Sequence, residues 1–121
     1  EWEPRPEFQG YINVLHGGIQ TTLLDELASW TVYVKAGTAG VTSSIDIRFL
    51  KPVFVNKGKL RLQARLTGRD EREAVIRAEI VSHRNQVCTE AEIRYFLFPE
   101  KLAREKYFYP GREAFFESLK E

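Results

Sequence analysis

The chain has 121 residues, of which 43% are hydrophobic and 29% charged, and these values indicate one globular domain over residues 1–121. Its 18 basic and 17 acidic residues nearly balance, which argues against a nucleic-acid partner. No apolar run approaches the length of a membrane span and no signal-peptide pattern opens the chain, so we expect a cytoplasmic protein with no membrane partner.

The sequence offers little that would bind a transition metal. It contains one cysteine, Cys88, and two histidines, His16 and His83, which lie far apart. A single cysteine excludes an internal disulfide and fits a reducing compartment. A dedicated zinc site needs several clustered ligands of these types, and we therefore expect no metal.

A helix is predicted from Gly17 or Gly18 to about Lys35. Residues 1–9 precede it as a leader segment with two prolines, and residues 10–15 as a short extended piece or loop. Apolar residues then recur at spacings of four, four, three and four, which lines them up on one helical face: Ile19, Leu23, Leu27, Trp30 and Val34. Gly37 and Gly40 follow in the positions of a C-terminal stop and turn.

The start of this helix has the features of a site for a carbonyl oxygen. The Gly17-Gly18 pair is expected to leave backbone N–H groups bare at the helix mouth, where the helix dipole adds positive potential. Such donors stabilise a carbonyl oxygen or the oxyanion formed from it. Asp25, the first acid of the helix, lies two turns further on, on the same flank as Gly18 and at the edge of the apolar face. It can therefore face a second subunit.

From Val41 on, apolar residues alternate with polar ones, which is the period of half-buried strands. Four strands are predicted, at residues 41–52, 60–67, 74–81 and 87–98, with polar turns at 68–71 and 83–86. Short loops between successive strands indicate an antiparallel meander. After residue 99 the sequence predicts a helical tail, with one helix near residues 101–106 and a second after Pro110.

Together these elements predict an α+β fold in which one long helix packs in the concave face of one curved antiparallel sheet. The edge strands of such a sheet are prone to associate. Pairing two sheets edge to edge satisfies them, and we therefore expect a homodimer.

Two sequence motifs carry a resemblance to a known family. The first is HGG at residues 16–18 followed by LLDE at 23–26, and the second is GVT at 40–42 followed by DIRFLKPV at 46–53. With these motifs the chain resembles the hotdog-fold acyl-CoA thioesterases, in particular the PaaI-like group, over about residues 8–98. The resemblance implies an acyl-CoA substrate, no cofactor, and a homodimer or a dimer of dimers with its sites at the subunit interface.

The resemblance also implies roles for individual residues. Gly17 and Gly18 fall at the oxyanion-binding end, and Asp25 of the other subunit acts as general base or as nucleophile. Thr42 falls where the family often has a Ser or Thr that helps to place the water. One position departs from the pattern: many members have an Asn six residues before the His, where this chain has Gly10.

Several alternatives stay open at these positions. The His16 ring either contacts substrate or holds the loop through a hydrogen bond. Glu26 is the alternative to Asp25 as the catalytic carboxylate. Asn13 is the only Asn near Gly10, the position where many family members have an Asn. A basic group around the 52–58 turn is either a solvated rim or a phosphate contact for coenzyme A: Arg48, Lys51, Lys57 and Lys59.

Three functions fit this sequence. The leading hypothesis is hydrolysis of an acyl-CoA thioester to a carboxylic acid and free CoA, which needs an oxyanion donor and a group that activates water. A hydratase or dehydratase on the same fold is the first alternative, but it usually needs a different His-containing loop. A non-catalytic acyl-CoA-binding or sensing module is the second, and the intact Asp25 argues against it.

Overall fold

In the computed structural model, residues 2–99 form one helix and one sheet, and the structure is described for these residues only. The predicted C-terminal helices lie outside the described residues. A short 3₁₀ turn at Pro6–Phe8 comes first, and the long helix ends in a π-helical turn at Val32–Ala36. The main elements are α1 (Gly17–Thr31), β1 (Gly40–Phe49), β2 (Arg61–Arg69), β3 (Glu73–Val81) and β4 (Val87–Leu97).

All four strands pair antiparallel, in the order β1-β4-β3-β2. The predicted strands are therefore confirmed, and so is the meander from β2 to β4. The prediction is wrong for the first connection, because β1 and β2 form opposite edges of the sheet. Residues 50–60 make this connection, and they are long enough to cross the roughly 14 Å between the first and fourth strand.

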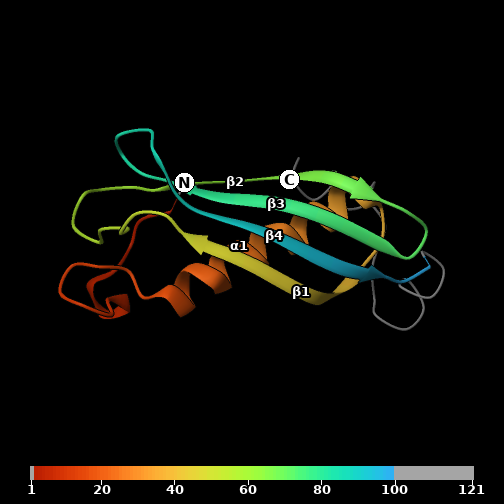
Figure 1. Ribbon diagram of the computed structural model, residues 1–121, viewed down its shortest axis with the longest axis horizontal. Helices are drawn as coiled ribbons and strands as arrows, with labels where there is room; N and C mark the ends of the chain where they lie inside the picture. The colour runs from red at the N-terminus through yellow and green to blue at the C-terminus, as the bar shows by residue number, and fades with distance from the viewer. Residues whose placement is uncertain (1, 100–121) are drawn as a thin grey trace, which may run out of the picture.

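Helix α1 lies across one face of the sheet (Figure 1) and buries a different stripe from the predicted one. Its buried residues recur every four positions: Gln20, Leu24, Ala28, Val32 and Ala36. The predicted stripe lies one or two positions away, and its members are half-buried except for Trp30, which is 52% exposed. The two alanines explain the shift, because their small side chains let the backbone approach the sheet closely. The core beneath includes Ile76 and Ile93, both fully buried.

The helix ends where the sequence predicts. After the π-helical turn, Gly37 adopts a left-handed conformation with φ +74°, which glycine takes without a steric penalty. The Thr38 hydroxyl donates to the Phe98 carbonyl at 2.6 Å and ties this turn to the chain that follows β4. The chain then enters β1 at Gly40, where a Cβ would lie 2.8 Å from the Phe96 carbonyl oxygen.

A β-bulge near the start of β1 changes which side chains face the helix. The register with β4 shifts between Thr42 and Ser44. Beyond the bulge Ile45 and Ile47 pair with buried residues of β4, whereas before it Thr42 pairs with the buried Tyr95. A bulge inserts one extra residue and so reverses the alternation of faces. Thr42 therefore points toward the helix.

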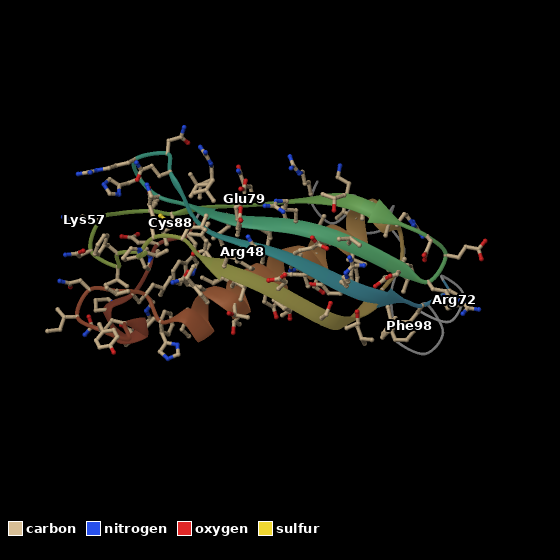
Figure 2. All side chains as sticks on the ribbon, in the orientation of Figure 1. Arg48, Lys57, Arg72, Glu79, Cys88 and Phe98 are labelled. Carbon is tan, nitrogen blue, oxygen red and sulfur yellow. The ribbon has the colours of Figure 1, made fainter. Side chains whose placement is uncertain are left out.

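The other face of the sheet carries paired charges (Figure 2). Arg77 contacts Glu90 at 2.9 Å, and Arg94 contacts Glu92 at 3.0 Å. Arg48 lies on this face with Glu90 as its cross-strand neighbour. Such a charged face is typical of a sheet surface that meets water.

Candidate functional site

The HGG segment forms the N-terminus of α1, and His16 caps it. Its Nδ1 accepts a hydrogen bond from the Gly18 N–H at 2.9 Å, so the ring holds the loop in place. The expectation of two bare N–H groups is therefore wrong for Gly18. The Gly17 N–H has no hydrogen-bond partner among residues 2–99. A Cβ on Gly17 would lie 3.3 Å from Phe49 Cζ, so Gly17 sits against the end of β1.

A buried glutamine, which the sequence analysis did not single out, fixes this loop to the sheet. Gln20 is 4% exposed, and its Nε2 donates to the Leu15 carbonyl at 3.0 Å. Its Oε1 accepts from the Thr89 hydroxyl of β4 at 2.5 Å. Gln20 begins the row of buried residues along α1, so a correct assignment of that row would have exposed it as a buried polar group that needs partners.

Asp25 is held by two hydroxyl groups of its own chain. Thr42 Oγ1 donates to Asp25 Oδ1 at 3.0 Å, and Tyr95 OH donates to the same oxygen at 2.7 Å. Tyr95 OH also lies 3.0 Å from the Asp25 backbone carbonyl oxygen. Asp25 Oδ2 has no hydrogen-bond partner among the described residues. The carboxylate is thus held in one orientation through Oδ1.

Tyr95 is the second site residue that the sequence analysis did not single out. Burial raises the pKa of its hydroxyl far above the ordinary value of 10.0, and the hydrogen bond and negative charge of Asp25 raise this pKa further. Tyr95 therefore stays protonated and remains a donor to Asp25 at all ordinary pH values. The bulge in β1 brings Thr42 to the same carboxylate.

The raised pKa makes a stability prediction. Above pH 10 an unfolded chain releases the Tyr95 proton while the native protein keeps it, so the free energy of unfolding falls as pH rises. The slope approaches about 1.4 kcal/mol per pH unit. Tyr95→Phe has no hydroxyl to ionise at this position, so its free energy of unfolding does not fall for this reason. The difference in stability between wild type and this variant should therefore shrink between pH 9 and pH 11. Urea unfolding of both proteins at a series of pH values measures this, and a constant deficit would contradict it.

The remaining predicted residues lie outside this cluster. Glu26 is exposed and lines a shallow hollow with Ser29, Trp30 and Tyr33. Asn13 sits in the loop before His16 with φ 62°, a left-handed conformation that asparagine tolerates. Gly10 packs close to the His16 ring, since a Cβ there would lie 3.5 Å from Cδ2.

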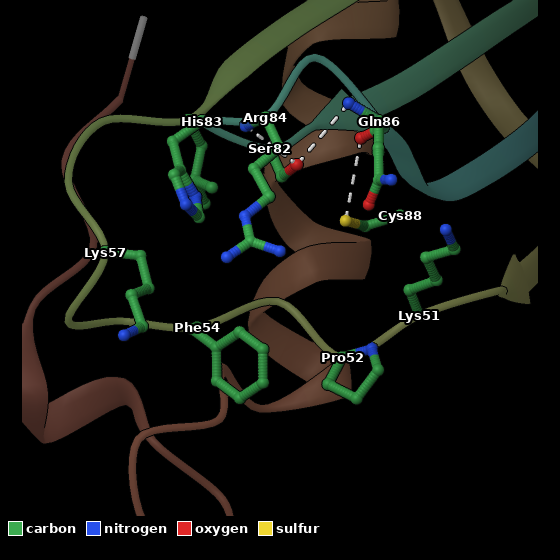
Figure 3. A pocket seen from close by; sticks show the side chains of 10 residues that line it. Lys51, Pro52, Phe54, Lys57, Ser82, His83, Arg84, Gln86 and Cys88 are labelled. Carbon is green, nitrogen blue, oxygen red and sulfur yellow. Dashed lines mark hydrogen bonds between the residues drawn. The ribbon is translucent and has the colours of Figure 1, made fainter.

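The predicted basic group is divided in the structure. Lys51 and Lys57 line one cavity (Figure 3), which Arg84 also lines. Lys59 lines a neighbouring hollow. Arg48 belongs to the charged face of the sheet and does not join them, because its strand position turns it away from the loop.

Comparison with known proteins decides the family. The family model described as the Thioesterase superfamily matches residues 12–89, which is more than half of the chain. The chain belongs to the thioesterase superfamily. None of the curated proteins matched it. The matched residues include the helix mouth, Asp25 and Thr42, whereas Tyr95 lies beyond the end of the match.

Solved structures show that this thioesterase-superfamily chain has the hotdog fold, as predicted. A protein of Streptococcus mutans UA159 bound to acetyl CoA is 21% identical, with a TM-score of 0.75 over 82% of this chain and 78% of that chain. A Bacillus halodurans protein with CoA is 24% identical, with a TM-score of 0.68 over 78% and 66%. Escherichia coli PaaI is 21% identical, with a TM-score of 0.70 over 78% and 67%.

Residues 2–99 contain no group of three or more His, Cys, Asp or Glu side chains placed to hold a metal ion. No helix within them combines the length and apolar character needed to cross a membrane.

Proposed function

We propose that this protein hydrolyses acyl-CoA thioesters, with Asp25 as the catalytic carboxylate. The observation that carries the proposal is the carboxylate clamp, in which Thr42 and Tyr95 bind Oδ1 and leave Oδ2 without a partner among the described residues. A carboxylate with one fixed and one reactive oxygen suits a general base or a nucleophile. The solved hotdog structures bound to acetyl CoA and CoA support a coenzyme A thioester as the substrate.

One chain alone does not supply both halves of this site. Gly17 and Asp25 are eight residues apart on α1, so their backbones are separated by about 12 Å along the helix. A carbonyl oxygen and its attacking atom must lie about 3 Å from the groups that serve them. The Gly17 N–H therefore acts together with the Asp25 of a second subunit.

The edge strand β1 supports this arrangement. Asp25 contacts Thr42 near one end of β1, and Gly17 packs against Phe49 at the other end. If two copies pair their β1 edges antiparallel about a twofold axis, the Thr42 end of one subunit comes beside the Phe49 end of the other. Val41, Phe49 and Leu50 are each at least half exposed along this edge. We propose this homodimer, and its association into a dimer of dimers stays a prediction.

In the proposed reaction, the substrate carbonyl oxygen accepts a hydrogen bond from the Gly17 N–H of one subunit. Asp25 Oδ2 of the other subunit removes a proton from water, whose oxygen attacks the carbonyl carbon. The C–S bond then breaks, and the CoA thiolate takes up the proton. In the nucleophilic variant, Oδ2 attacks first and water hydrolyses the resulting anhydride. His16 contributes by holding the loop, since its Nδ1 is occupied by Gly18.

Replacing Gly17 by proline tests the proposed carbonyl donor. Proline removes the N–H, and the first helical position tolerates it. His16, with φ −59° and ψ 135°, already has the conformation that a following proline demands. We expect Gly17→Pro to lower kcat by about 10²–10³ relative to Gly17→Ala. The alanine variant is the matched control, because it adds the same Cβ against Phe49 and keeps the N–H. Equal kcat values in the two variants would rule Gly17 out as the donor.

A thiol-release assay over a panel of acyl-CoAs tests the function itself. We expect catalytic release of CoA from at least one member of the panel, without added metal or cofactor. Tight acyl-CoA binding without any turnover would instead favour a sensing module. Formation or loss of a carbon–carbon double bond without thiol release would favour a hydratase or dehydratase.

A further inference from the structure

A cavity of about 260 Å³ lies between the loop after β1 and the turn that joins β3 to β4 (Figure 3). Its walls combine apolar and cationic side chains, among them Lys51, Pro52, Phe54, Lys57, Arg84 and Cys88. We propose that this cavity binds the phosphorylated nucleoside end of the CoA thioester, with the base against Phe54 and the phosphates on Lys57 and Arg84. The inference rests on the proposed function and adds to it the site that recognises the nucleotide.

Within residues 2–99, the positive charges around the cavity have no acidic partner. None of the described residues that line it is acidic. Within residues 2–99 no carboxylate lies within ion-pair distance of Lys51, Lys57 or Arg84, whereas Arg77 and Arg94 on the sheet are paired. Cations that converge without a counter-charge repel one another, and a bound phosphate relieves that repulsion through charge-assisted hydrogen bonds.

The shape suits one end of a ligand. Pockets that enclose a whole drug-sized ligand measure about 300–1,000 Å³, so this smaller cavity takes a base and its sugar while phosphates stay at the rim. Phe54 is 41% exposed, and an exposed aromatic ring beside cations is the combination that stacks a base and binds its phosphates. The turn that carries Arg84 is ordered, since Ser82 Oγ accepts from the Arg84 and Gln86 N–H groups.

The cavity is joined to the helix mouth by backbone pairing. Phe54 forms a β-bridge with Val14, and the Leu15 N–H donates to the Val53 carbonyl at 2.7 Å. From Val14 to Gly17 the chain spans at most about 10 Å. The backbone of the pantetheine arm of CoA has about as many bonds as four extended residues, so it spans about 14 Å. A nucleotide in the cavity can therefore present its thioester at Gly17.

The test compares two substrates that carry the same acyl group, one on CoA and one on pantetheine, which lacks the nucleotide. We expect Lys57→Gln/Arg84→Gln to raise KM for the acyl-CoA by about three- to tenfold per charge removed, with kcat and the pantetheine thioester unaffected. Adenosine 3′,5′-bisphosphate should compete with acyl-CoA on the wild type and lose that inhibition in the double variant. The matched control is Lys35→Gln/Arg72→Gln, which removes the same two charges at the other end of the molecule.

Each other outcome overturns the inference. Equal effects of Lys57→Gln/Arg84→Gln on both substrates, or an equal effect of the control variant, would show a general charge effect. Cation-dependent preference for a thioester on an acidic carrier protein over the CoA thioester would assign the surface to that protein. Failure to hydrolyse either thioester would contradict the proposed function, and calorimetry with adenosine 3′,5′-bisphosphate would then still decide whether the cavity binds a nucleotide.

Discussion

Asp25→Asn should lower kcat for acyl-CoA hydrolysis by about 10²–10⁴ while leaving the fold and the oligomeric state unchanged. The expectation follows from the clamp on this side chain. The substituted amide can present its carbonyl oxygen to Thr42 and Tyr95, because both are hydroxyl donors to Oδ1. The amide nitrogen then takes the place of Oδ2, where it can neither accept a proton from water nor attack a carbonyl carbon. Steady-state kinetics by thiol release measures the loss, and thermal unfolding checks the fold.

Glu26→Gln is the matched control for this variant. Glu26 is the neighbouring acid, it is exposed, and neither Thr42 nor Tyr95 is shown donating a hydrogen bond to it. We expect its kcat to stay within about twofold of wild type, as for a surface substitution away from the site. If Glu26→Gln abolished activity while Asp25→Asn kept it, the catalytic carboxylate would be Glu26 and not Asp25.

The fold could be predicted from the sequence where the pattern repeats. The alternation along β2, β3 and β4 and the length of α1 placed each element to within a few residues. The strand order could not be predicted in the same way, because nothing local distinguishes a β1 that pairs with β2 from one that pairs with β4. The buried stripe of α1 was misassigned for a related reason: Leu23 and Leu27 lie beside the row that contains Leu24 and Ala28, and the approach of the sheet chooses between the two rows.

The candidate site was predictable only in part, and the missing residues share a cause. Asp25 was singled out by its place on the helix and by the resemblance, and Thr42 by the resemblance alone; the structure brings them within hydrogen-bonding distance. Tyr95 faces the helix through the alternation of β4, but its hydroxyl meets Asp25 only because α1 packs on that face, and no pattern within β4 shows this contact. Gln20 and Arg84 depend on neighbours from other elements, far away in the chain, and periodicity over one element cannot reveal them.

Asp25→Asn and Gly17→Pro, each inactive alone, should complement each other when one subunit of each forms a dimer. In a hybrid of Asp25→Asn with Gly17→Pro, one site combines both substitutions. The other site combines Asp25 of the proline chain with Gly17 of the asparagine chain, and is therefore intact. Random association makes about half of the dimers hybrids, each with one intact site of two, so activity should return to roughly a quarter of wild type. Each variant alone should be reduced by about 10² or more.

Co-expression of the two chains with different affinity tags allows the hybrid to be isolated by two purification steps. The control pairs Asp25→Asn with the double variant Asp25→Asn/Gly17→Pro, a hybrid in which neither site has an aspartate at position 25 and which should stay inactive. Activity in the first hybrid requires that the Gly17 N–H and the Asp25 carboxylate come from different chains, because about 12 Å of helix separates them within one chain. A first hybrid no more active than its parents, or a wild-type protein that is monomeric while active, would show that one chain completes the site by itself.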